Sequence, residues 1–535
     1  MCGGYPRGRC SVILDNNEDY SRAAPETYED DRFRWPLTFF RYSCQCFGNF
    51  AGYMCHQCLY GYTGKNCTER IVRVRKDFKT VTAREKRYIL STFEKARTTQ
   101  SDYVILDVTK GADPVKNVTF LTASVYDYLA YIHYYASRKT IFDNSSYPGN
   151  QTSFRCDEPH FPSLDFAHRG TNFPLWHRYY MILWETEMQR LTGDIHFTFP
   201  YWNWTDAGVE CEVCTDDFLG THDRRGGISA ASPVSKWYGL CVRQVGVCEA
   251  CDPTVRFQLT RTPGRVQSAP RLPTAATVNF ALEQNVYDFP DYTTNVPNAS
   301  FRGCLEGYVG VPMKDVYRLH NEVHMFFGGV LNSATSASWD PLFYFHHSFM
   351  DKLLETWLRR TGALPAHLPL TDSVPGHHRN SYLMAFFPTQ VSAAYFRTSE
   401  QLGYTYDDMI TSPSYKTDVK PEAPMTSSEV KFAAAVESSH LGHICDHNHH
   451  HDDHTAEISD VTMSARLMQA VSIETALLLV LLLVVISTCG FVFSRKSRGY
   501  SRVPSHDLYD NGHCNQGLSA AVEPYSDSDI ENIKR

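Results

Sequence analysis

Four stretches of the chain repeat apolar residues at helical spacing, and polar or glycine- and proline-rich segments separate them. They cover residues 122–138, 175–191, 314–327 and 344–360. Apolar positions three and four residues apart share one face of an α-helix, so each stretch is predicted to be a helix with a buried face. Pro174 stands just before the second stretch, where the first turn of a helix tolerates proline. The pattern predicts a mainly α domain with a four-helix bundle core and long loops.

A fifth apolar stretch has a different character. Residues 475–493 contain 19 mostly apolar residues and no charge, which is long enough for one transmembrane helix. Arg495, Lys496, Arg498 and Arg502 follow immediately, and this positive flank predicts a cytosolic C-terminus. A buried core helix is the alternative, and the length and the flanking charges argue against it. We therefore predict a single-pass type I membrane protein whose preceding residues are lumenal.

Cysteines cluster near the N-terminus, where Cys44, Cys46, Cys55, Cys58 and Cys67 follow one another closely. The spacing resembles an EGF-like module, a small fold that depends on disulfides because it lacks the area for its own core. We predict a Cys-rich EGF-like domain over residues 1–70. Zinc at Cys55 and Cys58 is the alternative. The 17 cysteines of the chain favour an oxidising compartment and therefore disulfides. Six Asn-x-Ser/Thr sequences fit a glycoprotein.

The remaining boundaries follow from composition. Residues 71–410 are predicted to form the main domain, and residues 411–474 a polar linker. The linker holds a histidine-rich patch from His440 to His454, which either binds a metal loosely or is a solvated stalk. Residues 494–535 form a polar cytoplasmic tail whose Tyr-x-x-Val sequence could be read by sorting adaptors.

Two further features bear on the ends and the partners of the chain. Fifteen cysteines precede residue 475, an odd number, and no signal peptide follows Met1. We therefore expect that the N-terminus is truncated and has lost a signal peptide. The net charge of −8, without a basic run in the folded part, argues against nucleic acid as a partner.

Six histidines in two spaced sets carry the candidate chemistry. The first set is His133, His168 and His177, and the second is His320, His324 and His347. His320 and His324 are four residues apart and share one helix face. Neutral imidazole suits copper and zinc, so the two sets predict a pair of adjacent metal ions with nitrogen ligands. A packed core histidine is the alternative at each position, but six of them would leave many buried ring nitrogens without partners.

Several longer motifs surround these histidines, and together they resemble the chordate tyrosinase family over nearly the whole chain. The motifs are Asp165-Phe-Ala-His168, Trp176-His-Arg178, Pro200-Tyr-Trp-Asn-Trp204, Leu319-His-Asn-Glu-Val-His324, Trp339-Asp-Pro-Leu-Phe-Tyr-Phe-His-His347 and Glu355-Thr-Trp-Leu-Arg-Arg360.

The resemblance implies a type-3 centre with two coppers, one held by His133, His168 and His177 and the other by His320, His324 and His347. It implies an oxidoreductase that uses O2 to hydroxylate phenols such as L-tyrosine and to oxidise catechols such as L-dopa to quinones. It also implies that Glu306 and Asn321 hold a water that deprotonates the phenol, and that the protein makes melanin at the melanosome membrane.

Other details leave the substrate and the metal open. His346 resembles the tyrosinases, whereas Tyr308 resembles the tyrosinase-related proteins, which are associated with zinc. The alternatives are a zinc-binding protein resembling dopachrome tautomerase, an O2-binding protein or a melanosomal scaffold. Cys156 and Cys304 are extra cysteines that could pair with each other. An ordinary histidine pKa near 6.5 predicts that metal loading and activity fall below about pH 6.

Overall fold

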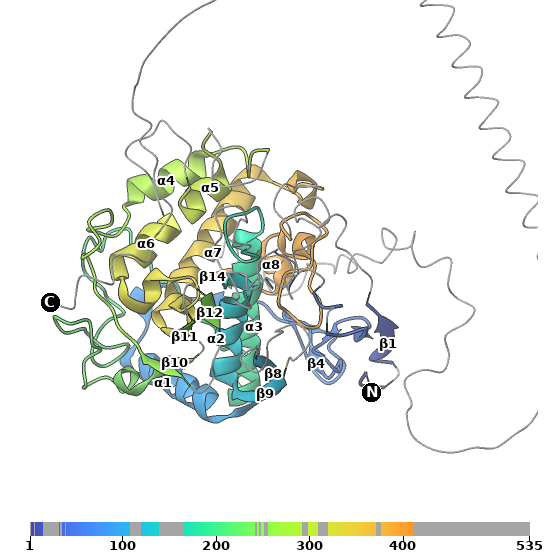
Figure 1. Ribbon diagram of the computed structural model, residues 1–535. Coiled ribbons are helices and arrows are strands. Elements are labelled where there is room, and N and C mark those ends of the chain that lie inside the picture. Colours follow the sequence, from blue (N-terminus) through green and yellow to red (C-terminus); the bar gives the residue numbers. More distant parts are fainter. Residues whose placement is uncertain are drawn as a thin grey trace, which may run out of the picture. The chain divides into compact units, whose positions relative to one another are not determined.

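The computed structural model describes residues 2–4, 6–13, 32, 35–37, 39–107, 119–138, 165–240, 243–245, 248–250, 255–290, 298–308, 319–370 and 376–409 (Figure 1). These residues belong to a compact unit that spans Met1–Cys445. The described part of the chain contains no helix with the length and apolar character needed to span a membrane. The predicted span at 475–493, the histidine-rich patch and the tail lie outside the described residues.

Helices form the core of this unit, as predicted. The described helices are α1 (Ala83–Thr98), α2 (Val125–Ser137), α3 (Phe173–Thr192), α4 (Ala275–Glu283), α5 (Phe301–Glu306), α6 (Leu319–Phe327), α7 (Leu342–Thr361) and α8 (Ser399–Leu402). The long helix α3 packs against α7, α1 and α5, and α1 also packs against α2 (Figure 1). The four predicted helices are confirmed as α2, α3, α6 and α7.

Local signals explain where these helices begin and end. Thr82 and Glu85 form a capping box at the start of α1, and the Ser124 hydroxyl accepts the backbone N–H of Asp127 at the start of α2. Pro174 occupies the first turn of α3, as the sequence predicts. Helix α3 ends at Gly193, whose φ of 75° is in the left-handed region that glycine adopts without steric cost.

In the described part of the chain, the strands pair only two at a time. The antiparallel pairs are β1 (Gly8–Val12) with β2 (Tyr42–Cys46), β3 (Phe50–Ala51) with β4 (Gln57–Cys58), β5 (Tyr62–Thr63) with β6 (Glu69–Arg70), β8 (Gln100–Asp107) with β9 (Thr119–Ser124), β10 (Tyr238–Leu240) with β13 (Arg256–Gln258), and β11 (Arg243–Val245) with β12 (Cys248–Ala250). The parallel pair β7 (Arg73–Arg75) and β14 (Tyr404–Tyr406) joins the two ends of the helical region.

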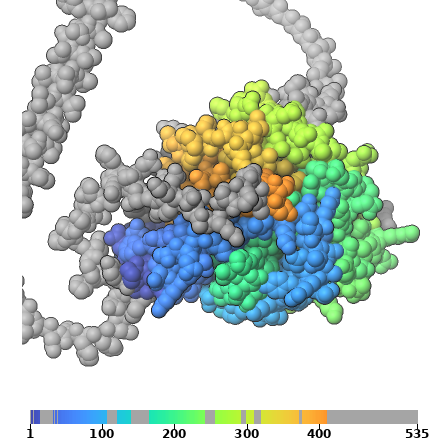
Figure 2. Space-filling view, turned by 180° about the vertical axis from the view of Figure 1, so that it is seen from behind, coloured from blue at the N-terminus to red at the C-terminus, as the bar shows by residue number. Residues whose placement is uncertain are grey.

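Disulfides hold the N-terminal Cys-rich segment, which confirms that expectation. The bonds are Cys2–Cys44, Cys46–Cys55 and Cys58–Cys67, and a fourth in the described residues joins Cys211 and Cys214. A zinc site at Cys55 and Cys58 is therefore wrong, because each sulfur is already bonded to another cysteine. Figure 2 shows the blue N-terminal residues packed against the rest of this unit.

Cys304 lies on α5 and differs from the N-terminal cysteines. Within the described residues it is fully buried and carries a free thiol. The expected disulfide between Cys304 and Cys156 is therefore wrong.

A buried ionic network locks α3 to α7. Arg75 of β7 contacts Glu185 of α3 at 2.9 Å and Asp351 of α7 at 2.7 Å, and Arg178 of α3 contacts Asp351 at 2.5 Å. These side chains are almost completely shielded from solvent. Removing one partner would leave a buried charge without its counter-charge, which destabilises the fold. The network therefore fixes how the two helices align. It thereby fixes the positions of His177, next to Arg178, and of His347, one turn before Asp351.

Candidate metal centre

Seven histidines from α2, α3, α6, α7 and the loop before α3 come together in two groups. One ring nitrogen of each member lies within 4.8 Å of those of the other members of its group. The first group is His133, His168 and His177, and the second is His320, His324, His346 and His347. The structure thus brings together all six histidines that the sequence singles out, and it adds His346.

The two groups are neighbours. The rings of His177 and His347 stack with centroids 4.4 Å apart and planes 13° apart. His168 of the first group also lies 5.9 Å from His320 of the second, measured between ring centroids. Two cations held by the two groups would therefore sit side by side between α3, α6 and α7.

Oxygen acceptors fix the ring orientation in the first group. Nδ1 of His168 lies 3.1 Å from Oδ1 of Asp165, and Nδ1 of His177 lies 2.9 Å from the backbone carbonyl of Phe173. A carbonyl or carboxylate oxygen only accepts, so both Nδ1 atoms carry the proton and both Nε2 atoms carry a lone pair. Nε2 of His177 lies 3.3 Å from Nε2 of His133, which places two candidate ligand atoms face to face.

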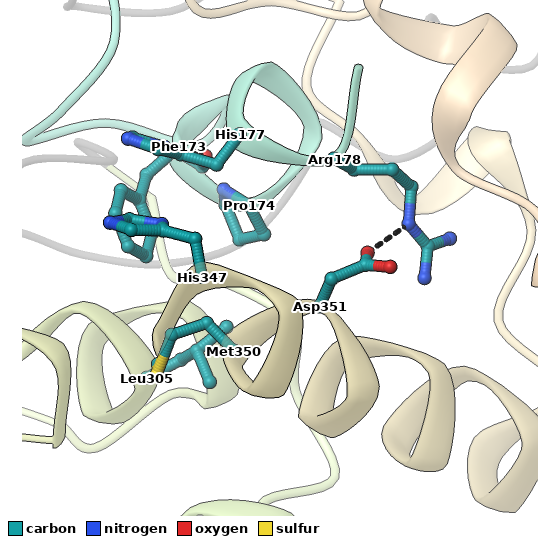
Figure 3. Close-up of a pocket in the computed structure, with 8 residues that line it drawn as sticks. All are labelled: Phe173, Pro174, His177, Arg178, Leu305, His347, Met350 and Asp351. Atoms are coloured by element: carbon teal, nitrogen blue, oxygen red, sulfur yellow. Dashed lines mark hydrogen bonds and ion pairs between the residues drawn. The ribbon is translucent and has the colours of Figure 1, made fainter. Parts of the chain in front are cut away.

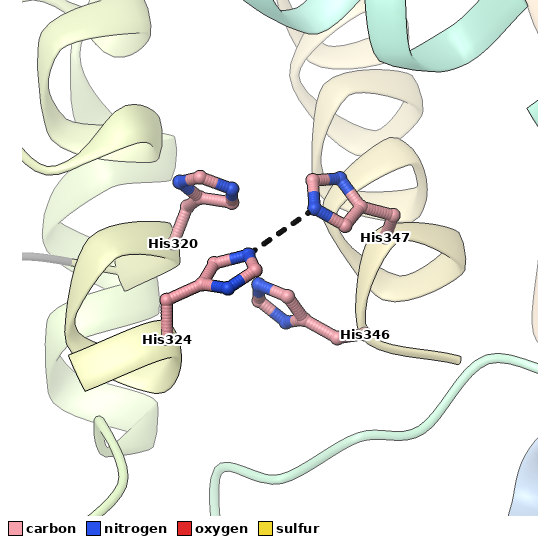
Figure 4. A group of neighbouring side chains, drawn as sticks. All are labelled: His320, His324, His346 and His347. Carbon is pink, nitrogen blue, oxygen red and sulfur yellow. Dashed lines mark hydrogen bonds between the residues drawn. The ribbon is translucent and has the colours of Figure 1, made fainter. Parts of the chain in front are cut away.

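Oxygen acceptors fix two rings of the second group in the same way, and Figure 4 shows the four histidines of this group. Nδ1 of His320 donates to Oδ1 of Asn321 at 2.9 Å, and Nδ1 of His324 donates to the backbone carbonyl of Leu331 at 2.7 Å. Nε2 of His324 lies 3.4 Å from Nε2 of His347. Nε2 of His320 is buried and has no hydrogen-bond partner among the described residues. Buried ring nitrogens without protein partners are what a bound cation would satisfy.

Burial favours the neutral form of five of the six predicted ligands. It lowers the pKa of His133, His177, His320 and His347 well below the usual histidine value, and lowers the pKa of His324 to about 4. Neutral imidazole is the form that binds a metal ion. The donor set fits copper, and imidazole alone does not distinguish copper from zinc.

His346 is the exception to the pattern. Its Nδ1 accepts a hydrogen bond of 3.1 Å from the indole N–H of Trp204. Indole nitrogen only donates, so Nδ1 of His346 carries a lone pair and the proton of the neutral ring sits on Nε2. Sequence reasoning noticed His346 as a mark of family resemblance but did not place it in the site. The sequence signal that could have placed His346 in the site is its position directly before the predicted ligand His347.

Asn321 contacts His320 of the second group, whereas Glu306 contacts the backbone of Arg169, which follows His168 of the first group. Glu306 ends α5, is buried, and accepts the backbone N–H of Arg169 with one oxygen and the Arg302 guanidinium at 3.2 Å with the other. Burial raises the pKa of Glu306, and Arg302 opposes that shift. Gly307 has a φ of 119°, and a Cβ there would lie 2.9 Å from Nδ2 of Asn321. Glycine at 307 therefore allows the end of α5 to approach Asn321 closely.

A small pocket lies behind the two groups, between α3, α5 and α7 (Figure 3). Its lining residues are Phe173, Pro174, His177, Arg178, Leu305, His347, Met350 and Asp351. Figure 3 shows His177 and His347 on one side and the Arg178–Asp351 ion pair on the other. The ionic network that aligns α3 with α7 therefore directly adjoins the histidines.

Comparison with known proteins agrees with this arrangement. The family model described as the common central domain of tyrosinase matches residues 123–360, which include all seven histidines. Tyrosinase of the dog, Canis lupus familiaris, is 36% identical over 416 residues, covering 75% of this chain and 76% of the dog protein. This chain belongs to the tyrosinase family. It is an oxidoreductase of the tyrosinase type, and the family implies a dicopper centre.

Two further proteins are similar to this chain. A protein of Ambystoma mexicanum named 5,6-dihydroxyindole-2-carboxylic acid oxidase is 34% identical, covering 76% of this chain and 77% of its own. A solved polyphenol oxidase from Thermothelomyces thermophila aligns with 63% of this chain and 88% of its own, at 16% identity and a TM-score of 0.40. The last likeness is too distant to add to the family assignment.

Proposed function

We propose that this chain is a copper monooxygenase and oxidase that hydroxylates phenols such as L-tyrosine at the ortho position and oxidises catechols such as L-dopa to quinones. Copper A is held by His133, His168 and His177, and copper B by His320, His324 and His347. The observation that carries the proposal is the ring orientation. Oxygen acceptors take the Nδ1 protons of two histidines in each group, His168 and His177 in the first and His320 and His324 in the second. Nε2 of His177 and Nε2 of His324 then face Nε2 of His133 and of His347 at 3.3 Å and 3.4 Å.

The protein's own residues prepare this reaction by orienting groups and moving a proton. Two bound coppers would supply the redox chemistry with O2, since imidazole ligands allow copper to cycle between its two oxidation states. Asp165 and Asn321 hold the rings of His168 and His320 in place. Glu306 and Asn321 hold a water that takes the proton of the phenol. The raised pKa of Glu306 suits a base that works near neutral pH.

The finer architecture and location belong to the same proposal. We propose that α2, α3, α6 and α7 form the four-helix bundle that holds the metals, and that residues 1–70 form an EGF-like module. We also propose a single-pass membrane anchor at 475–493, a lumenal catalytic domain at a melanosome membrane, and a role in melanin synthesis. The uncharged apolar run followed by basic residues supports the anchor.

The experiment that tests the function uses the full chain loaded with copper. Oxygen uptake is followed with L-tyrosine and with L-dopa, and metal content is measured by elemental analysis. Uptake with both substrates, abolished in His324→Ala, is the expected result. The matched control is His196→Ala, because His196 is exposed and follows the C-terminal end of α3, whereas His177 lies near the start of that helix. This variant should keep wild-type uptake.

The same experiment separates the alternatives. Bound zinc, no oxygen uptake and consumption of dopachrome would replace the proposal with a tautomerase function, because zinc has no redox chemistry. Reversible oxygen binding without phenol-dependent uptake would indicate an O2-binding protein. If the protein neither binds oxygen nor consumes dopachrome, the remaining alternative is a melanosomal scaffold.

A further inference from the structure

His346 stands in the second histidine group, but its Nε2 carries a proton where His320 and His324 carry a lone pair. The side chain is 1% exposed. Its ring stacks on His320 with centroids 5.5 Å apart and planes 19° apart, and meets the edge of His324 at 5.2 Å (Figure 4). His346 is therefore as close to the candidate copper B ligands as they are to one another.

The hydrogen bond from Trp204 decides what His346 can do there. With Nδ1 occupied as an acceptor, Nε2 of the neutral ring must carry the proton. A metal bond through Nε2 would require either a doubly deprotonated ring or the loss of the Trp204 bond. His168, His177, His320 and His324 have the opposite arrangement, with Nδ1 as the donor.

Trp204 is itself held rigidly, so the tautomer of His346 is fixed by the fold. The indole is fully buried and packs edge-on against Phe349, with centroids 5.1 Å apart and planes 88° apart. Phe349 lies on α7, the same helix as His346. Trp204 and His346 therefore keep a constant relationship, and the N–H at Nε2 is available on the side away from Trp204.

The N–H of His346 has no partner among the residues that the structure describes. Nε2 is buried and makes no hydrogen bond among the described residues. A buried donor is normally satisfied, so an acceptor from outside the protein is expected at this position. Within a group of neutral imidazoles beside a phenol-oxidising centre, a phenolic oxygen is the acceptor of matching chemistry.

We propose that His346 is not a metal ligand but a hydrogen-bond donor to the phenolic oxygen of the substrate, set in this role by Trp204. This inference rests on the proposed function. A donor in a buried site stabilises an anionic oxygen more than a neutral one, so His346 favours binding of the substrate as the phenolate. His346 is thus a residue that selects and orients the ionised substrate.

The test uses the full chain loaded with zinc, which is redox-silent and prevents turnover. The probe is 4-nitrocatechol, whose visible absorbance reports both its binding and its ionisation. In His346→Leu, we expect the same metal content as the wild type, at least tenfold weaker binding, and a higher apparent pKa of the bound probe. His346→Gln offers an amide N–H in place of the ring N–H and should restore much of both properties.

Trp204→Phe tests the tautomer without removing the imidazole. The freed Nδ1 can then hold the proton, so we expect probe binding between that of the wild type and that of His346→Leu. This variant also keeps the inference testable if His346→Leu fails to fold. The matched control is Trp237→Phe, because the indole of Trp237 bonds Glu94 at 2.7 Å, on α1, and not a histidine.

Three outcomes would overturn the inference. Loss of metal in His346→Leu would show that His346 is a ligand. Probe binding as strong as in the wild type in that variant would rule out the donor role. Failure of the unmodified zinc form to bind the probe would rule out the phenolic partner. The proposed function is judged separately, by oxygen uptake of the copper-loaded wild type. A wild type that oxidises phenols while His346→Leu binds the probe normally refutes only the inference.

Discussion

The hydroxyl of Tyr60, in the Cys-rich segment, donates a 2.6 Å hydrogen bond to the carboxylate of Glu185 in α3. The same carboxylate pairs with Arg75 at 2.9 Å and accepts the backbone N–H of Phe199 at 3.0 Å. Helix α3 also carries His177. The Cys-rich segment is therefore connected through one buried acid to the helix that supports the first histidine group.

Tyr60→Phe removes this bond and leaves a buried carboxylate with one donor fewer. Hydrogen bonds to charged groups contribute about 1.5–3 kcal/mol, so the free energy of unfolding should fall by about that amount. Denaturant unfolding measures the change. Tyr88→Phe is the control, because Tyr88 bonds Asp194 at an exposed site and its loss should cost much less. Equal effects of the two substitutions would refute a special role for the buried bond.

Asp165→Ala should weaken the binding of one metal ion, the one held by the first histidine group, without removing the other. Asp165 accepts the Nδ1 proton of His168, and such partners orient a ligand ring and raise its basicity. We expect about a 10- to 100-fold loss of affinity for one of the two metal ions, measured by competition with a chelator. Asp102→Ala is the control, because that carboxylate is half exposed and about 3.8 Å from its partner Arg190. Unchanged affinity in Asp165→Ala would contradict the assignment.

The stability of the metal-free protein should depend on pH. Burial lowers the pKa of His324 to about 4 and lowers those of His133, His177, His320 and His347, whereas the unfolded chain keeps values near 6.5. Between these values the unfolded chain binds protons that the folded protein does not. The melting temperature should therefore be highest above about pH 6.5 and fall as the pH approaches 4.

Scanning calorimetry of the metal-free protein at pH 7.5 and pH 5 checks this dependence, and His324→Gln should flatten it. A melting temperature that rises on acidification would contradict it.

The lowered pKa values also revise an expectation from the sequence. Protonation of these rings in the folded protein begins well below pH 6, so metal loading should persist to lower pH than an ordinary histidine predicts.

Cys304 should resist alkylation in the native protein. Burial raises the pKa of its thiol to about 12, so at pH 8 the reactive thiolate is scarcer than in an ordinary cysteine by about three orders of magnitude. Mass-spectrometric mapping after N-ethylmaleimide treatment should find Cys304 unmodified before denaturation and modified after it. Rapid native labelling of Cys304 would contradict the burial of α5.

Several elements were predictable because their causes are local in the chain. Apolar spacing decides where a helix can bury a face, so α2, α3, α6 and α7 were found from the pattern, and Pro174 marked the start of α3. The close spacing of the N-terminal cysteines indicated disulfides. The boundaries were less accurate, since α7 begins at Leu342 and not at residue 344.

By itself, the sequence determined the four helices α2, α3, α6 and α7 and which six imidazoles are available, because periodicity and residue type are properties of short segments; α1, α4, α5 and α8 were not predicted. The tertiary structure decided which ring nitrogen of His346 carries the proton, because that depends on a partner brought from elsewhere in the chain. Trp204 is 142 residues from His346. Only folding places its N–H against Nδ1 and so separates His346 from the histidines predicted to bind metal.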